Sequence, residues 1–238
     1  MAKERLDKLI ASTGRWSRRE VKTLVREGRV LVDGRIAGSA EEKYDAESCC
    51  IAVNGEELVL RRYTYVMLHK PAGVLSATED GWCRTVLDLL TPALRKIGVF
   101  PVGRLDKDTE GLLLLTDDGE LAHALLSPKK HVDKVYYARV SGRLTPEDCA
   151  AFEAGMTLGD GLECLPAGLE ILAAGETSEC LVTLREGKFH QVKRMLAARG
   201  KPVTYLKRLS MGSLRLDDTL APGEFRLLTA AEEAQLQR

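Results

Sequence analysis

Several features that would indicate a familiar class of site are missing from this sequence. Its six cysteines never occur at C-x-x-C spacing, so neither a zinc site of that kind nor a dithiol redox motif is indicated. Only 5% of its 238 residues are aromatic. Charged residues interrupt every apolar segment before the length of about 20 residues that a membrane-spanning helix needs, and no signal-peptide core follows Met1. We therefore expect a protein of the reducing cytoplasm without membrane association.

Cofactor motifs are absent as well. The sequence contains no G-x-G-x-x-G turn, no P-loop and no cluster of His, Cys, Asp and Glu with metal-ligand spacing. We therefore expect neither a cofactor nor a bound metal. One alternative is a hydrolase that uses Asp106 or Asp108 together with His123, but no nucleophile elbow or metal-ligand spacing accompanies these residues.

The charge is balanced overall but unevenly distributed. A formal net charge of zero argues against a protein that coats nucleic acid indiscriminately. Residues 1–37, however, carry ten basic and five acidic side chains, a net charge of +5. The segment that follows is acidic, with glutamates or aspartates at Glu41, Glu42, Asp45, Glu47, Glu56 and Glu57. This asymmetry indicates a localised anion-binding face near the N-terminus.

The first 60 residues predict two short helices followed by small hairpins. Residues 6–10 place apolar side chains at helical spacing, and the S-R-R-E sequence of residues 17–20 is a capping box that begins a second helix. Gly28 is suited to the left-handed position after that helix. Asp33–Gly34 and Asn54–Gly55 each lie between apolar strands and predict tight hairpin turns.

Beyond Arg61–Arg62, where we place a domain boundary, strands and helices alternate irregularly. This pattern favours a mixed, mainly antiparallel sheet flanked by helices over a doubly wound fold, and hence an α+β protein. We expect a small domain at residues 1–61 and a larger one at residues 62–238. The expected strands are residues 65–68, 112–116, 134–140 and 179–184, and the expected helices are residues 85–90, 120–127 and 146–154, one after residue 191 and one from Thr229.

A short polar turn in the larger domain carries a candidate reactive carboxylate. The sequence of residues 103–116 is GRLDKDTEGLLLLT, in which Asp106 precedes an apolar run that must be buried. A carboxylate at the mouth of a core strand is fixed and partly desolvated, as carboxylate chemistry requires. From these residues alone, an Asx-turn with no chemical role explains Asp106 equally simply.

The N-terminal region resembles the S4-type RNA-binding domain over about residues 3–60. The matching segments are Arg5–Lys8, Ser17–Glu20 and Gly28–Gly34. The resemblance implies that cations of the two helices and the following turn contact RNA phosphates, which raises affinity without reading sequence. A solvated helix face is the simpler alternative. The implied RNA-binding residues are Arg5, Arg18, Arg19, Lys22, Arg26 and Arg29.

Four separated segments then match one family in order. They are His69–Gly73, Gly103–Asp106 with its T-x-G-L continuation, Lys134–Tyr136, and Gly187–Met195, which reads GKFHQVKRM. The chain resembles RNA pseudouridine synthases of the RsuA type, in which an S4-type domain precedes the synthase domain. The resemblance covers nearly the whole chain. It implies conversion of a specific uridine in ribosomal RNA to pseudouridine, with base flipping and without a cofactor.

The resemblance also implies roles for four residues. Asp106 is the essential carboxylate, acting on the ribose or as a nucleophile. Tyr136 lies against the flipped uracil, and Lys193 is the basic partner that keeps Asp106 ionised. Arg104 fills the gap that the extruded uridine leaves. Taken singly, Tyr136 is better explained as a sheet residue and Lys193 as a surface helix residue, so each role depends on the ordered set of motifs. We assign no catalytic role to Lys70 or His190.

We expect the substrate to be 16S rRNA, as naked RNA or as a small-subunit assembly intermediate, and the protein to be a monomer. This preference rests on resemblance: the H-Q-V-K-R-M form of the last motif, the segment Ala221–Thr229, and the absence of a long basic tail. The alternatives are a synthase acting on 23S rRNA and a non-catalytic rRNA-binding or ribosome-assembly factor.

Overall fold

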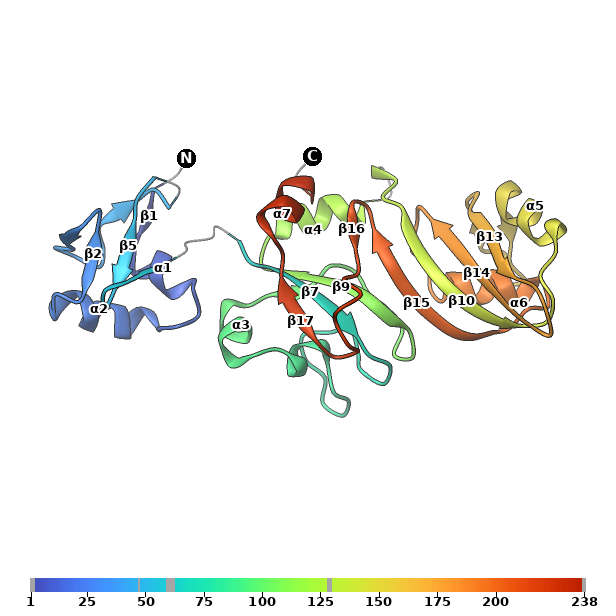
Figure 1. Cartoon of the computed structure of the whole chain (residues 1–238), viewed down its shortest axis with the longest axis horizontal. Coiled ribbons are helices and arrows are strands. Elements are labelled where there is room, and N and C mark those ends of the chain that lie inside the picture. Colours follow the sequence, from blue (N-terminus) through green and yellow to red (C-terminus); the bar gives the residue numbers. More distant parts are fainter. Residues whose placement is uncertain (1–2, 47, 59–62, 128–129, 237–238) are drawn as a thin grey trace. The chain divides into compact units, whose positions relative to one another are not determined.

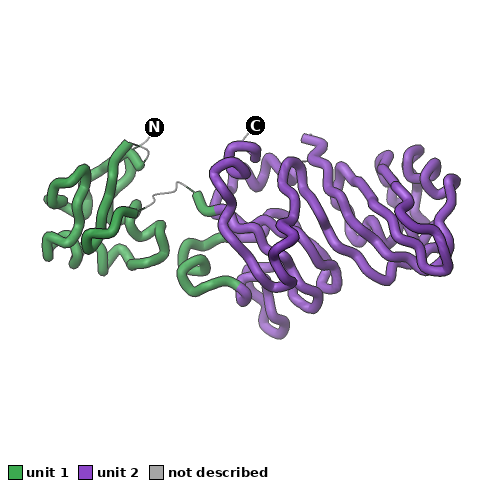
Figure 2. The backbone as a smooth tube through the Cα atoms, viewed as in Figure 1, with its two compact units in different colours: residues 1–64, 90–99 green, residues 65–89, 100–238 purple. Residues whose placement is uncertain are grey.

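The computed structural model describes residues 3–46, 48–58, 63–127 and 130–236. Contacts within the chain divide it into two units, residues 1–64 with 90–99 and residues 65–89 with 100–238 (Figure 2). The predicted domain boundary at Arg61–Arg62 lies outside the described residues. No helix in the described part of the chain has both the length and the apolarity needed to cross a bilayer.

Local sequence signals form the helices of the first unit. The Ser17 hydroxyl accepts a hydrogen bond from the Glu20 amide, and the Glu20 carboxylate accepts one from the Ser17 amide, so the predicted capping box is confirmed. The unit contains β1 (Glu4–Arg5), α1 (Leu6–Ala11), α2 (Arg18–Arg26), β2 (Val30–Val32), β3 (Arg35–Ile36), β4 (Lys43–Tyr44), β5 (Ile51–Val53), β6 (Glu56–Leu58) and α3 (Pro92–Ile97).

Two small sheets hold the first unit together. One has the order β3-β2-β5-β6 and the other pairs β1 with β4, all antiparallel. The hairpin turns at Asp33–Gly34 and Asn54–Gly55 have positive φ at both central residues, as tight hairpins require. The apolar stripes of α1 and α2 pack on the sheet in one core that includes Leu6, Leu9, Ile10, Val21, Leu24, Val30, Val32, Ile51 and Val53.

The second unit is built on a nine-stranded sheet (Figure 1). Its path is β13-β14-β10-β15-β9-β7-β17, with β16 paired to β15 and β8 to β9. Only the β15–β9 pair is parallel, so a mixed, mainly antiparallel sheet is confirmed. The strands are β7 (Tyr65–Lys70), β8 (Phe100–Pro101), β9 (Glu110–Thr116), β10 (Lys134–Ser141), β13 (Gly168–Ala173), β14 (Thr177–Leu184), β15 (Val203–Met211), β16 (Leu214–Arg215) and β17 (Phe225–Leu227).

The helices of the second unit lie mostly where the sequence predicts them. They are α4 (Gly119–Leu126), α5 (Pro146–Ala154), α6 (Gln191–Ala198) and α7 (Ala230–Leu236), and β11 (Met156–Thr157) pairs with β12 (Glu163–Cys164) in a separate hairpin. The helix predicted at residues 85–90 is instead one 3-10 turn, η1 (Val86–Leu89). Four residues are too few for the hydrogen bonds of a stable α-helix.

A glycine forms the junction between the two halves of the large sheet. Gly111 on β9 pairs with Lys70 on one side and with Arg208 on the other. Its φ is +106°, and a Cβ at this position would overlap the Arg208 backbone. Only glycine therefore permits β9 and β15 to pair. The turn that carries Asp106 immediately precedes this junction, so its end is anchored at the centre of the sheet.

Candidate active site and RNA-binding surface

A buried ammonium group fixes the Asp106 turn from below. Lys70 ends β7 and its side chain is fully buried. Burial lowers the pKa of this lysine to about 8. Its Nζ donates to two carbonyl oxygens of the turn after Asp106, those of Lys107 at 3.3 Å and Thr109 at 2.9 Å, and to the carbonyl of the adjacent Pro71 at 3.0 Å. A residue to which the sequence gave no role is therefore a structural anchor of the candidate site.

Ser76 fixes the same turn from a second direction. Its hydroxyl accepts a hydrogen bond from the Leu105 amide and donates to the Leu105 carbonyl, both at 3.0 Å. Within the turn, the Thr109 amide donates to the Asp106 carbonyl at 3.1 Å. The backbone on each side of Asp106 is thus held by buried groups, and its side chain is presented in a defined direction.

Lys193 joins the two carboxylates of this turn. It lies on α6, and its Nζ is 2.9 Å from Asp106 Oδ2 and 2.6 Å from Asp108 Oδ1. The side chains of Lys193 and Asp106 are 22% and 25% exposed, whereas that of Asp108 is 75% exposed. Burial opposes the charge on Lys193, but its hydrogen bonds to Asp108 and Asp106 outweigh this effect and raise its pKa. Lys193 in turn holds the pKa of Asp108 below its ordinary value.

The loop before α6 brings two further aromatic groups to the site. His190 precedes the helix with a φ of +50°, and its Nε2 lies 3.5 Å from Asp106 Oδ1. The Phe189 ring stacks on His190 at a centroid distance of 3.8 Å and is 74% exposed. The sequence indicated no catalytic role for His190. The structure shows no cap hydrogen bond from its side chain and places it beside the carboxylate instead.

Three of the four predicted catalytic residues line one small cavity, of about 70 Å³. Tyr136, on β10, is only 9% exposed, whereas Arg104 is exposed beside it. Asp106 and His190 belong to the polar lining, together with Thr109, Lys188 and Gln191. Lys193, the fourth predicted residue, reaches the cavity through its ion pair with Asp106. His123, the partner in the hydrolase alternative, lies on α4 and is not among the lining residues.

A larger concavity of about 610 Å³ lies on the other face of the same sheet. It is lined by Val135, Leu181 and Thr183. Successive side chains of a strand point to opposite faces, so these three residues of β10 and β14 lie on the face opposite Tyr136. None of the predicted catalytic residues lines it. The predicted catalytic side chains therefore converge on the smaller cavity and not on the larger one.

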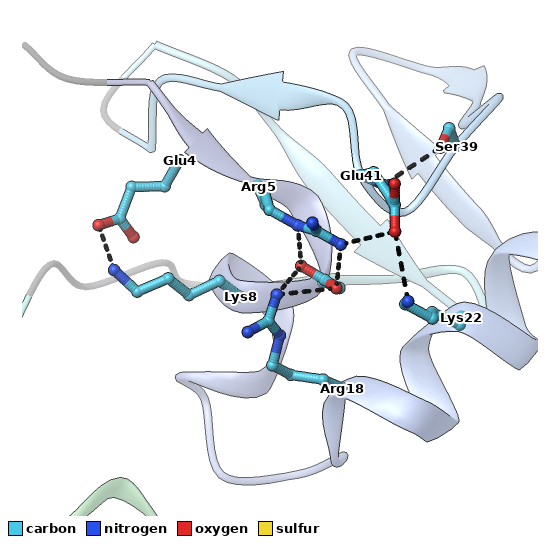
Figure 3. Close-up of polar contacts among 8 residues, drawn as sticks. Glu4, Arg5, Lys8, Arg18, Lys22, Ser39 and Glu41 are labelled. Carbon is cyan, nitrogen blue, oxygen red and sulfur yellow. Dashed lines mark hydrogen bonds and ion pairs between the residues drawn. The ribbon is translucent and has the colours of Figure 1, made fainter.

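The first unit gathers four of the six predicted RNA-binding cations. Arg5, Arg18, Arg19 and Lys22 line one concavity of about 480 Å³ together with Asp7 and Glu41, which we call the cationic concavity. Figure 3 shows Arg5, Arg18 and Lys22 converging from β1 and α2.

The other two predicted cations stand apart from the cationic concavity. Arg26 donates to Thr23, and Arg29 donates to Asn54 and Glu27. No group of three His, Cys, Asp or Glu side chains among the described residues is placed to hold a metal ion.

Comparison with known proteins identifies both parts of the chain. Residues 64–198 match the family model described as RNA pseudouridylate synthase, and residues 4–48 match the model of the S4 domain. A solved structure described as a pseudouridylate synthase is 35% identical, with a TM-score of 0.68, and the match covers 98% of this chain and 99% of that one.

Relatives of similar length bear three different names. An uncharacterized RNA pseudouridine synthase of Bacillus subtilis, YtzG, is 49% identical over 96% of both chains. The ribosomal small subunit pseudouridine synthase A of Vibrio cholerae is 40% identical over 98% of this chain and 99% of the relative. The ribosomal large subunit pseudouridine synthase B of Bacillus subtilis is 39% identical over 98% of this chain and 96% of the relative.

Proposed function

We propose that this protein converts one specific uridine of 16S rRNA to pseudouridine. The chain belongs to the RNA pseudouridylate synthase family and carries an S4 domain. The observation that supports a catalytic role for this chain is the pairing of a fixed, partly buried Asp106 with Lys193 at 2.9 Å, beside a cavity that Tyr136 and Arg104 line. A factor that only bound RNA would not need a carboxylate held in this way.

The reaction rearranges bonds without changing the formula of the nucleotide. The bond between N1 of uracil and C1′ of ribose breaks, a bond between C5 and C1′ forms, C5 loses a proton and N1 gains one. In our proposal the Asp106 carboxylate acts either as a nucleophile or as a base on the ribose. Lys193 orients this carboxylate through their ion pair.

Tyr136 and Arg104 serve the flipped nucleotide in this proposal. A base within a stack cannot reach the cavity, so it must be extruded at a cost of a few kcal/mol. The buried ring of Tyr136 offers a flat face and one hydroxyl to the uracil. The exposed guanidinium of Arg104 is planar and cationic, so it can stack in the vacated space and contact a phosphate.

The assignment to the small subunit rests on resemblance. The Vibrio cholerae small-subunit synthase matches almost end to end at 40% identity, but the Bacillus subtilis large-subunit synthase matches at 39%. Because the two identities differ by so little, 23S rRNA is the second candidate substrate.

Mapping pseudouridines in 16S and 23S rRNA tests the proposal directly. The RNA is taken from cells that lack the protein and from the same cells supplied with wild type or with Asp106→Asn. We expect one 16S uridine that is modified only when the wild type is present. A site that follows the protein in 23S rRNA would overturn the small-subunit assignment. Unchanged modification of both RNAs, with rRNA still bound, would leave the non-catalytic binding factor.

A further inference from the structure

The cationic concavity is organised around a buried acid. Asp7 lies in the first turn of α1, and its side chain is only 1% exposed. Both of its oxygens accept hydrogen bonds from two guanidinium groups. Arg5 donates from Nε at 3.1 Å and from Nη2 at 3.0 Å, and Arg18 donates from Nη2 at 3.0 and 3.1 Å. One carboxylate therefore holds two arginines that come from different elements.

The carboxylate is charged despite its burial. Burial alone would raise the pKa of Asp7, but the hydrogen bonds from Arg5 and Arg18 outweigh it and lower the pKa. Its partners are more exposed, with 34% of the Arg5 side chain and 53% of the Arg18 side chain accessible. Asp7 thus acts from behind the surface, and the guanidinium groups face outward.

A second acid lies on the open side of the same groups. The Glu41 side chain is 61% exposed and accepts hydrogen bonds from Arg5 Nη2 at 2.9 Å and from Lys22 Nζ at 3.3 Å (Figure 3). An exposed ion pair of this kind contributes little to stability because water and salt screen it, so another anion can readily replace Glu41. Glu41 occupies the position that an RNA phosphate would take between Arg5 and Lys22.

We propose that Asp7 is a positioning residue that holds Arg5 and Arg18, which form a preformed phosphate clamp together with Lys22, and that Glu41 occupies the Arg5 and Lys22 side of this clamp until an RNA phosphate displaces it. The proposal rests on the proposed function in one respect, that the first unit binds ribosomal RNA. A long arginine side chain loses rotamer entropy when it is immobilised. Folding has already immobilised Arg5 and Arg18, so the RNA meets them in place.

The substitution Asp7→Asn tests the proposal, because a positioning role and a purely electrostatic role of Asp7 predict opposite effects on RNA affinity. Asp7→Asn and Glu41→Gln each remove one negative charge from the cationic concavity. If charge alone decided affinity, both variants would bind RNA more tightly. If Asp7 positions the arginines, Asp7→Asn weakens binding although the surface becomes more positive.

The experiment measures filter binding of the full chain to unmodified 16S and 23S rRNA transcripts over a series of salt concentrations. We expect Glu41→Gln to bind about threefold more tightly, with a slope of log K against log salt steeper by about 0.7 to 0.9. We expect Asp7→Asn to bind about tenfold more weakly. Tighter binding by both variants, or no change in either, would overturn the clamp.

A second pair of variants keeps the test decisive if Asp7→Asn fails to fold. Arg18→Lys and Arg19→Lys both preserve charge, and the two residues are neighbours on α2 that line the same concavity. Arg18 is held by Asp7, whereas the Arg19 side chain has no ion pair with any described residue. Arg18 reaches both Asp7 oxygens from Nη2 of a planar guanidinium, and a lysine would replace it with a flexible, more strongly hydrated ammonium. We expect Arg18→Lys to lower affinity about fivefold and Arg19→Lys to change it less than about twofold.

Circular dichroism melts of each full-length variant show whether it is folded. Equal affinities for folded Arg18→Lys and Arg19→Lys would refute the positioning role while leaving the RNA-binding function intact. If the wild type binds neither transcript, the proposed function fails, and the ligand of the clamp fails with it. The two failures are therefore distinguishable.

Discussion

The two polar clusters of this molecule are built in opposite ways. In the candidate active site one cation, Lys193, lies between two carboxylates, Asp106 and Asp108. In the cationic concavity one carboxylate, Asp7, lies between Arg5 and Arg18. In each cluster a central group holds two side chains of the opposite charge. The central Asp7 is buried, whereas the central Lys193 is partly exposed. The sign of the groups held outward matches the proposed partner: a carboxylate for chemistry on a sugar, and cations for RNA phosphates.

The two clusters also differ in how much of the fold depends on them. The Asp7 carboxylate is almost fully buried, so loss of its arginine partners would leave a buried charge without compensation. Lys193 and Asp106 remain partly exposed, so their pairing contributes far less to stability. We infer that substitutions in the active site change the reaction with the fold intact, whereas changes at Asp7 affect the fold and the binding surface together.

Substitution of the two active-site acids separates their roles and gives the largest expected effect. Asp106→Asn is near-isosteric but removes the reactive carboxylate, so we expect kcat to fall at least about a thousandfold. Asp108→Asn is the matched control, because Asp108 contacts the same Lys193 nitrogen but its side chain is 75% exposed. We expect kcat of this variant to fall less than about tenfold. Pseudouridine formation in transcripts measures both.

RNA affinity provides the internal check on this prediction. Neither asparagine alters the first unit, so filter binding of both variants should stay within about twofold of wild type. Equal loss of activity in the two variants would show that the pair acts as a unit and that Asp106 has no separate chemical role. Retained activity in Asp106→Asn would refute the mechanism.

Most local signals in the sequence predict the structure, with the short helix at residues 85–90 as an exception, whereas long-range strand pairing is not predicted. The capping box at residues 17–20 and the hairpin turns are decided by neighbouring residues, and all are confirmed. The central strand β15 was not predicted, because Lys207 and Arg208 interrupt its apolar pattern. Its place depends on pairing with β9 and β10, which lie far away in the chain.

The same limit applies to the candidate site. The turn at Asp106 is visible as a polar segment before an apolar run, but the contact between Lys193 and Asp108 joins residues 85 positions apart. Lys193 was predicted to belong to the site only because of the resemblance to a family. The anchoring by Lys70 gave no sequence signal, since a lysine at a strand end is usually solvated. Its burial results from the packing of β7 against the turn.

Removal of Lys193 tests whether it serves the carboxylates or the substrate. Lys193→Met leaves Asp106 and Asp108 close together with no cation between them, and like charges at this range disfavour the ionised form of one of them. We expect kcat to fall about a hundredfold. In the double variant Lys193→Met with Asp108→Asn the repulsion is gone, so about tenfold of the loss should return. Absence of any recovery would indicate that Lys193 contacts the substrate directly.

Lys70 differs from both clusters, because backbone carbonyls hold this cation and no carboxylate of the described residues does. Its substitution gives the smallest expected effect on kcat. Lys70→Met removes the donor to three carbonyls around Asp106, so we expect kcat to fall about tenfold through misplacement of the turn. The sharper readout is the dependence of stability on pH. Burial lowers the pKa of Lys70 to about 8 from an ordinary value of 10.5.

Between these two values the unfolded chain keeps the proton that the folded chain has lost, so the unfolding free energy of the wild type rises with pH. The gain over this window is up to about 3 kcal/mol, it is absent below pH 8, and Lys70→Met lacks it. Urea unfolding of both proteins at several pH values in the window measures the difference. Lys107→Met, in the same turn but exposed, is the control and should follow the wild type. Identical pH dependence of the wild type and Lys70→Met would contradict a buried ammonium beneath Asp106.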